Sequence, residues 1–205
     1  HDEQGQLLSP GAFLPAAERY GLIEQLDRWV AEQVARWLSS EAQDFAELNY
    51  CSMNVSAVSL GAPEFAEYIH ELLEAHPGVG PRLFIEITET AAIHSLGKAR
   101  DFMQRLAGLG VRFALDDFGT GFCSFTYLKH LPVDILKIDG SFVQGLANTP
   151  VDQAMVQSMN QVAHALGKQT IAESVENEET LLLLKEIGVD YAQGHFLGRP
   201  SSMIN

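Results

Sequence analysis

Apolar residues recur along the chain with two different spacings. In one segment Ile23, Leu26, Val30, Val34 and Trp37 fall three or four positions apart, which marks one face of a helix. Elsewhere, short apolar runs such as "RLFIEIT" have the length and residue types of buried strands. The two patterns alternate along the chain, and this alternation is typical of an α/β protein.

The pattern predicts strands and helices in regular succession. A first short helix has Ser9 as its N-cap and Pro10 at its first position, and Gly21 ends it. Further helices are predicted over 23–37, 63–76, 95–109, 124–131, 151–166 and 178–187. Strands are predicted over 48–56, 82–88, 111–115, 134–139, 169–174 and 190–194.

This order of elements predicts a parallel sheet. Strands that are separated by helices of about 10–15 residues pair in parallel through right-handed crossovers, and the sheet is then either doubly wound or closed into a barrel. No GxGxxG follows the first predicted strand, which disfavours a dinucleotide-binding fold. No linker-like stretch divides the 205 residues, so we expect 1–205 to form a single domain.

Polar residues gather at the carboxyl ends of the predicted strands. The residues that share this placement are Asn54, Glu86, Glu89, Asp116, Asp117, Lys137, Asp139, Glu173, Glu176 and Gln193. The active sites of β/α barrels lie at this end of the strands and are built by several strands together. Several carboxylates in one place repel each other unless cations hold them. The sequence therefore predicts a cation-binding active site at this face.

The adjacent carboxylates of Asp116 and Asp117 indicate the type of cation. Amide and carboxylate oxygens favour Mg²⁺, Mn²⁺ or Ca²⁺ over metals that prefer thiolates. Neighbouring aspartates could serve two ions about 4 Å apart, an arrangement that activates water for phosphoryl displacement. The simpler interpretation is a solvated Asp-Asp turn, which the polar residues at the other strand ends disfavour.

Lys137 and Glu173 are the candidate catalytic groups. A charged Lys137 could hold the attacking water or neutralise developing charge, and Glu173 could act as a base. Alternatively, Lys137 could form a Schiff base, as in an aldolase barrel. The surrounding acidic residues favour the charged lysine because they stabilise its protonated form.

The composition limits the partners. The formal charge of −14, from 13 basic and 27 acidic residues, disfavours binding of long nucleic acid. Cys51 and Cys123 form no CxxC motif, and the first residues do not resemble a signal peptide. No apolar run approaches the length of about 20 residues that a membrane span needs. We therefore expect a reduced protein in the cytoplasm.

Four long segments carry a family resemblance. They are "SMNVSAVSL", "FIEITET", "DDFGTGFCSFTYLKHLPVDILKID" and "IAESVENEETLLLLKEIGVDYAQGHFLGRP". With these segments the chain resembles the EAL domain, the bacterial domain that hydrolyses cyclic di-GMP, over essentially its whole length. The resemblance implies a modified TIM barrel with one antiparallel strand, two Mg²⁺ or Mn²⁺ ions and linear pGpG as the product.

The resemblance also implies roles for individual residues. The positions where the family binds its metal ions are occupied by Asn54, Glu86, Asp116 and Asp117. Lys137 falls on the residue that contacts the catalytic water, and Glu173 on the essential glutamate of an A-E-G-V-E segment that reads "AESVE" here. The remaining matches are Gln193 in the active site, Glu176 near the substrate guanine, and Glu89, which steadies the loop with Asp117.

The sequence departs from the family pattern in two places. The Glu-Ala-Leu motif, whose glutamate is a metal ligand in the family, does not occur, and "HDEQGQLLSPG" aligns with the segment just after it. We therefore expect an EAL barrel shortened at its N-terminus, with about six strands. The second departure is Phe122, Cys123 and Phe125 in the loop after "DDFGTG", which leave the ligands in place.

Two functions follow from the resemblance. The first is a metal-dependent phosphodiesterase that acts on cyclic di-GMP by two-metal activation of water. The second is a degenerate or truncated domain that binds the dinucleotide or a partner without turnover. Because one metal ligand is missing, we expect this chain alone to be slow or inactive, and a version extended through the missing strands to be active. A homodimer and an upstream GGDEF or sensor domain are also implied.

Overall fold

The computed structural model describes residues 8–40, 50–121 and 126–200. The helices are α1 (Pro10–Arg19), α2 (Ile23–Ser40), α3 (Ala57–Leu60), α4 (Pro63–Ala75), α5 (Glu89–His94), α6 (Leu96–Ala107), α7 (Gly140–Val143), α8 (Pro150–Ala165) and α9 (Glu178–Ile187), with 3₁₀ turns η1 (Gly80–Arg82) and η2 (Tyr127–Lys129). The strands are β1 (Cys51–Asn54), β2 (Leu83–Thr88), β3 (Arg112–Phe118), β4 (Ile135–Ile138), β5 (Gln169–Ala172) and β6 (Tyr191–Ala192).

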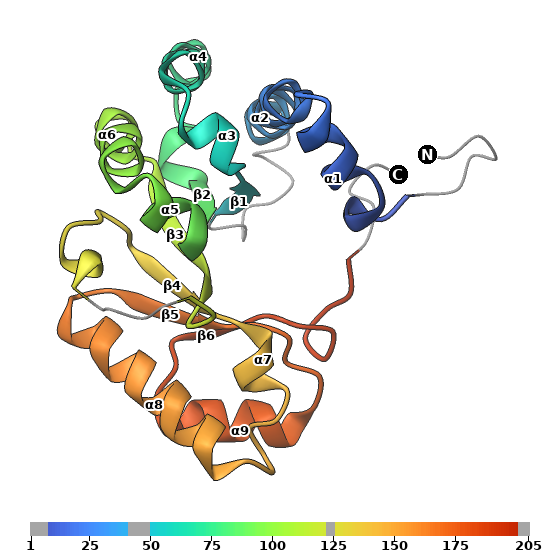
Figure 1. The fold of residues 1–205 in the computed structure, drawn as a ribbon, viewed down its shortest axis with the longest axis vertical. Helices are drawn as coiled ribbons and strands as arrows, with labels where there is room; N and C mark the ends of the chain where they lie inside the picture. The colour runs from blue at the N-terminus through green and yellow to red at the C-terminus, as the bar shows by residue number, and fades with distance from the viewer. Residues whose placement is uncertain (1–7, 41–49, 122–125, 201–205) are drawn as a thin grey trace.

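The strands form a single sheet in the order β1-β2-β3-β4-β5-β6, and each neighbouring pair is parallel. Figure 1 shows α2, α4 and α6 beyond one end of this sheet and α8 and α9 beyond the other, so that helices follow the outer side of a half-barrel. The prediction of a parallel α/β fold with about six strands is confirmed. The antiparallel strand that the resemblance implies is not among the strands of the described residues.

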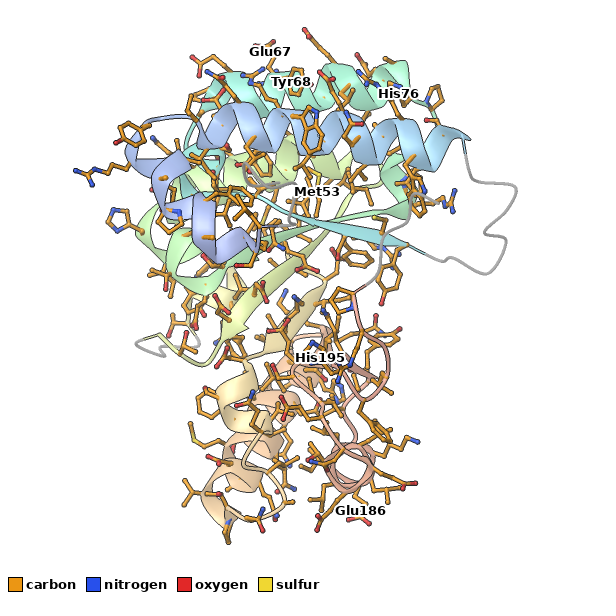
Figure 2. All side chains as sticks on the ribbon, turned by 90° about the vertical axis from the view of Figure 1, so that its right-hand side faces the viewer. Met53, Glu67, Tyr68, His76, Glu186 and His195 are labelled. Carbon is orange, nitrogen blue, oxygen red and sulfur yellow. The ribbon has the colours of Figure 1, made fainter. Side chains whose placement is uncertain are left out.

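The two faces of the sheet have different surroundings. Outward-facing residues such as Ile85, Leu115 and Leu136 pack with the helices in the main core. Figure 2 shows Met53 on β1 beneath the helices of this outer layer. In the described part of the chain, the inner face carries a small apolar cluster, made by Phe84, Ala114, Ile135 and Ile171 with Tyr50 packed against it. Because side chains alternate between faces, residues two positions further along these strands also point inward.

An aromatic group lies on the inner face at the amino end of the strands. The rings of Tyr50 and Phe84 meet edge to face with centroids 4.8 Å apart. The guanidinium carbon of Arg112 lies 4.1 Å from the Phe84 centroid, which is a cation–π contact. This aromatic group packs on the inner face next to the polar residues, on the side toward the amino ends of the strands, and so helps to fill the half-barrel there.

Three short helices, which the periodicity does not predict, begin where strands end. The N-cap residues Ser56, Thr88 and Asp139 each accept a hydrogen bond from a backbone N–H in the first turn of α3, α5 and α7. The bonds measure 3.2 Å, 3.3 Å and 3.0 Å respectively. These caps turn the chain directly after β1, β2 and β4, and so fix the strand ends where the polar residues gather.

Most strands and helices differ from the prediction by a few residues at their ends, for example β4, β5 and β6, which are shorter than predicted. Two larger differences stand out. β3 continues to Phe118 instead of ending at Leu115, because Thr88 pairs with Asp116 and Ile138 with Phe118. The helix predicted over 124–131 is only the turn η2 within the described residues, while 124 and 125 lie outside them. None of the helices in the described ranges combines the length and apolar content that crossing a bilayer requires.

The junction between β5 and β6 yields a prediction about stability and pH. The Asp190 carboxylate accepts hydrogen bonds from the Thr170 backbone N–H and from His164 Nε2, both at 2.8 Å. Partial burial raises the pKa of Asp190, but these bonds lower it more, so its pKa lies below the ordinary value. The stabilisation is therefore complete above about pH 4, the ordinary pKa of an unfolded aspartate, and is lost as the pH falls through the folded-state pKa.

We therefore expect Asp190→Asn to lower the free energy of unfolding at pH 7 by about 1–2 kcal/mol, since it removes a charged acceptor. Urea denaturation at pH 7 and at pH 3 measures this loss, which should shrink at the lower pH. Glu186→Gln on α9, an exposed change without a hydrogen bond or ion pair in the described part of the chain, is the control. A loss that is equally large at both pH values would contradict the assignment to the charge.

Candidate functional site

The site is centred on the buried ammonium group of Lys137, which is 3% exposed. Its Nζ lies 2.8 Å from Glu86, 3.0 Å from Asp116 and 2.7 Å from Glu173. These partners come from β2, β3 and the end of β5, so one cation ties three strands to β4. Burial lowers the pKa of Lys137, but Glu86, Glu173 and Asp116 raise it more, and the net pKa is above the ordinary value. Lys137 is therefore charged at neutral pH.

An irregularity in β3 brings both aspartates to this centre. Leu115 pairs with Leu136 and Phe118 with Ile138, so β3 advances three residues while β4 advances two. Within this β-bulge Asp117 has a left-handed backbone with φ of 55°. In a regular strand Asp116 and Asp117 would point to opposite faces. Instead, ligand oxygens of Asp116, Asp117 and Glu173 lie within 4.8 Å of one another.

Among the described residues, the carboxylates of this cluster outnumber the cationic groups in contact with them. Glu86, Asp116 and Glu173 share the ammonium of Lys137, and Asp117 lies beside Asp116. Burial, Asp116 and Asp139 raise the pKa of Asp117, while burial also raises the pKa of Glu173. Shared negative charge in a partly buried site is the condition under which hard divalent cations bind oxygen ligands. The acidic cluster can therefore hold a metal ion.

Glu89 holds the loop that follows the aspartates. Its side chain is fully buried, at 0% exposure, and accepts hydrogen bonds from the Gly119 N–H at 3.0 Å and the Gly121 N–H at 3.4 Å. The Tyr127 hydroxyl donates to its other oxygen. Gly119 has φ of 104°, which a residue with a side chain rarely adopts. The predicted role of Glu89 in steadying the loop with Asp117 stays a prediction, and these hydrogen bonds are the contacts through which Glu89 would act.

Asn54 and Gln193 extend the site toward the two edges of the sheet. Asn54 is exposed at the end of β1 and pairs in register with Glu86, so the two side chains leave the sheet on the same face. Gln193 follows β6, and its backbone exchanges hydrogen bonds with Ala172 and Val175 at 2.8 Å and 3.0 Å. Among the described residues, neither side chain makes a hydrogen bond or an ion pair with the Lys137 cluster, and their predicted roles stay predictions.

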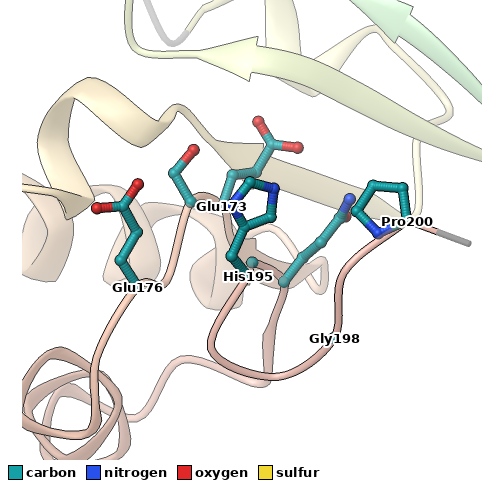
Figure 3. A pocket seen from close by; sticks show the side chains of 8 residues that line it. Glu173, Glu176, His195, Gly198 and Pro200 are labelled. Atoms are coloured by element: carbon teal, nitrogen blue, oxygen red, sulfur yellow. The ribbon is translucent and has the colours of Figure 1, made fainter. Parts of the chain in front are cut away.

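A pocket of about 250 Å³ opens beside the acidic cluster. It is lined by Glu173, Ser174, Glu176, Gln193, Gly194, His195, Gly198 and Pro200. Figure 3 shows the side chains of Glu173, Glu176 and His195 rising to the same side of the loops that carry them, with Pro200 across the pocket. Glu173 therefore belongs both to the charged centre and to the pocket wall.

A family model for the EAL domain matches residues 1–200. The chain belongs to the EAL domain family. The six-stranded half-barrel described above is thus the EAL fold. Phe122, Cys123 and Phe125, where the sequence departs from the EAL pattern, lie outside the described residues.

Curated EAL relatives cover almost all of this chain. Cyclic di-GMP phosphodiesterase PdeB of Shewanella oneidensis is 42% identical over 200 residues, which are 97% of this chain and 23% of PdeB. Cyclic di-GMP phosphodiesterase PdeF of Escherichia coli is 33% identical, with coverage of 99% and 27%. MucR of Pseudomonas aeruginosa, a bifunctional diguanylate cyclase/cyclic di-GMP phosphodiesterase, is 34% identical over 98% of this chain and 29% of MucR. The chain thus spans about a quarter of the length of these relatives.

Solved EAL structures have the same fold. The PaMucR phosphodiesterase in complex with c-di-GMP superposes with a TM-score of 0.92 at 32% identity, covering 98% of this chain and 81% of that chain. The FimX EAL domain from Pseudomonas aeruginosa bound to c-di-GMP gives a TM-score of 0.89 at 33% identity, with coverage of 97% and 79%. This chain therefore spans about four-fifths of each solved EAL chain.

Sequence reasoning missed five of the residues that line the pocket, namely Ser174, Gly194, His195, Gly198 and Pro200. A Cβ on Gly194 would lie 2.2 Å from the Val175 nitrogen and 2.3 Å from its oxygen, so no side chain fits there. The close approach brings Gln193 beside the end of β5. A lone glycine after a polar strand end is the one signal in the sequence that could have indicated this contact.

We expect Glu89→Gln to destabilise the EAL domain by about 1–3 kcal/mol, because the buried amide cannot accept all three hydrogen bonds. The looser Asp117 loop should also weaken Mn²⁺ binding by about 10- to 100-fold. Thermal unfolding and Mn²⁺ titration measure the two effects. Glu67→Gln, which removes an exposed ion pair with Arg105 on the helices, is the control. Unchanged Mn²⁺ binding in Glu89→Gln would contradict the loop-steadying role.

Proposed function

We propose that this EAL domain hydrolyses cyclic di-GMP to linear pGpG with two Mg²⁺ or Mn²⁺ ions. The observation that carries the proposal is the convergence of Asp116, Asp117 and Glu173 beside the charged Lys137. The family membership and the relatives named as cyclic di-GMP phosphodiesterases support it. The proposal applies to the protein of which this chain is the EAL portion.

The donor set fits divalent ions of the hard type. Asn54, Glu86, Asp116 and Asp117 would hold them, since all four offer oxygen ligands and three are carboxylates around a single ammonium. Bound Mg²⁺ or Mn²⁺ would lower the pKa of water and stabilise charge on the phosphodiester oxygens. Because of the bulge at Asp117, the carboxylates of Asp116 and Asp117 point to the same face of the sheet, where they could bind two neighbouring ions.

Lys137 and Glu173 would act on the attacking water. The ammonium of Lys137 is held in place by three carboxylates, so its charge can offset developing negative charge without moving. Burial raises the pKa of Glu173, which makes its carboxylate a stronger proton acceptor. The 2.7 Å contact between the two groups places base and cation side by side.

The pocket beside this centre would take one end of the dinucleotide. Glu176 and Gln193 offer acceptor and donor groups that match the polar edge of guanine, and both line the pocket with Glu173. In this arrangement the base is held while its phosphodiester lies at the acidic cluster. The implied homodimer and the GGDEF or sensor domain upstream stay predictions.

Two other functions compete with hydrolysis. A Schiff-base aldolase needs a neutral lysine, whereas Lys137 is a charged partner of Glu86, Asp116 and Glu173. A domain that binds cyclic di-GMP without turnover is the stronger alternative, because no Glu-Ala-Leu motif occurs in the 205 residues. FimX, whose EAL domain is named only as bound to c-di-GMP, shows that an EAL fold of this similarity takes the ligand.

We expect the intact protein to form pGpG only with added Mg²⁺ or Mn²⁺, and Asp117→Asn to lower the rate by about 100-fold or more, because a metal ligand is lost. Chromatography of the products measures the rate. Glu178→Gln, an exposed change in the first turn of α9, is the matched control. Tight binding of cyclic di-GMP by the intact protein without pGpG would favour the binding module. Borohydride trapping of a substrate on Lys137 would favour the aldolase.

A further inference from the structure

Ser174 has an unusual backbone for its residue type. Asp117 and Ser174 are the non-glycine residues of the described chain with positive φ, and each has φ of 55°. A side chain makes this left-handed conformation unfavourable, so the surrounding structure must hold it. Asp117 belongs to the acidic cluster, whereas Ser174 lies outside it. Ser174 directly follows Glu173, so the strained turn can affect the position of the Glu173 carboxylate.

The side chain of Ser174 fills the space above Gly140. A Cβ on Gly140 would lie 2.4 Å from the Ser174 Oγ and 2.7 Å from its Cβ, which is too close for real atoms. Gly140 is buried and is the first residue of α7, directly after the N-cap Asp139. The turn after β5 therefore packs tightly against the start of α7. The side chain of Ser174 in the turn occupies the space that Gly140 in α7 leaves free.

This tight packing lies directly beyond the last ladder bond between β4 and β5. The Glu173 N–H donates to the Ile138 carbonyl at 3.1 Å. Lys137 pairs in register with Ile171, two residues before Glu173, and the side chains of Lys137 and Glu173 meet at 2.7 Å. The Ser174–Gly140 contact thus lies one residue beyond Glu173, where the chain leaves β5 close to the start of α7.

We propose that Ser174 is a positioning residue that keeps Glu173 against Lys137 through the volume of its side chain over Gly140. The hydroxyl has no hydrogen-bond partner among the described residues, so filling the space is the contribution that the structure shows. The family segment has glycine here, and a glycine would relax the backbone while leaving the space empty. The strained backbone at Ser174 thus lowers stability, and in return its side chain holds Glu173 in position. The effect on turnover rests on the proposed function.

The test is a set of substitutions in the intact protein, with melting temperature, Mn²⁺ affinity and the hydrolysis of cyclic di-GMP as readouts. We expect Ser174→Gly to raise the melting temperature, since glycine adopts φ of 55° freely. The same variant should lower kcat by about tenfold and weaken Mn²⁺ binding several-fold, with a smaller effect on KM, because Glu173 is no longer held. Ser174→Ala keeps the Cβ and should recover most of these losses.

The reciprocal substitution tests the contact itself. Gly140→Ala should lower the melting temperature through its clash with Ser174, and Gly140→Ala combined with Ser174→Gly should recover it, because the new methyl takes the vacated space. Ser158→Gly is the matched control: on the exposed face of α8 it should lower the melting temperature slightly and leave kcat unchanged.

Three results would overturn the proposal. They are an unchanged kcat and Mn²⁺ affinity in Ser174→Gly, equal losses in Ser174→Ala and Ser174→Gly, and additive melting temperatures in the Gly140→Ala and Ser174→Gly pair. A wild-type protein that never hydrolyses cyclic di-GMP counts against the proposed function alone. In that case the Mn²⁺ affinities and the melting temperatures still decide the role of Ser174.

Discussion

The structure depends on a single buried ammonium group surrounded by carboxylates. Lys137 on β4 contacts Glu86, Asp116 and Glu173 within 3.0 Å, and each partner comes from a different part of the sheet. A buried charge without partners costs several kcal/mol. Moving one strand end out of place would leave buried charges on the other strands unpaired, so the strand ends stabilise each other. The acidic groups still exceed the positive charge, which leaves the site prepared for divalent cations.

The rest of the half-barrel holds this cluster in position. The bulge in β3 turns Asp117 to the side of Asp116, and the buried Glu89 fixes the loop that follows. Capped helices begin directly after β1, β2 and β4, and the glycines at 140 and 194 allow neighbouring turns to approach closely. Strain and tight contacts are thus concentrated within a few residues of the charged centre, while the outer helices contribute an ordinary apolar core.

The sequence was sufficient for the architecture, because apolar runs alternating with helical periodicity predicted the six strands and their parallel pairing. Among the polar residues predicted at the strand ends, Glu86, Asp116, Lys137 and Glu173 meet in the structure, while the roles of Asn54, Glu176 and Gln193 stay predictions. This works because the carboxyl ends of parallel strands share one edge of the sheet. The four-residue helices α3 and α7 carried no periodicity, since they are too short to show one, and only their N-caps Ser56 and Asp139 marked them.

Features that depend on tertiary contacts could not be predicted. Strand alternation places Asp116 and Asp117 on opposite faces, and only pairing with β4 reveals the bulge that reverses this. Likewise, residue type says nothing about the positive φ of Ser174 or its contact with Gly140, because both follow from how two turns meet. These unpredicted features all lie at the charged centre, where local preference yields to the geometry of the site.

Anomalous scattering from crystals of the intact protein soaked in Mn²⁺ tests the central claim most directly. The account predicts two peaks, about 4 Å apart, among the carboxylates of Asp116, Asp117 and Glu86, with Lys137 beside them. A map with no peak at the ends of β2 and β3, while Lys137 still contacts the same carboxylates, would show that the lysine alone balances the cluster and would contradict the account.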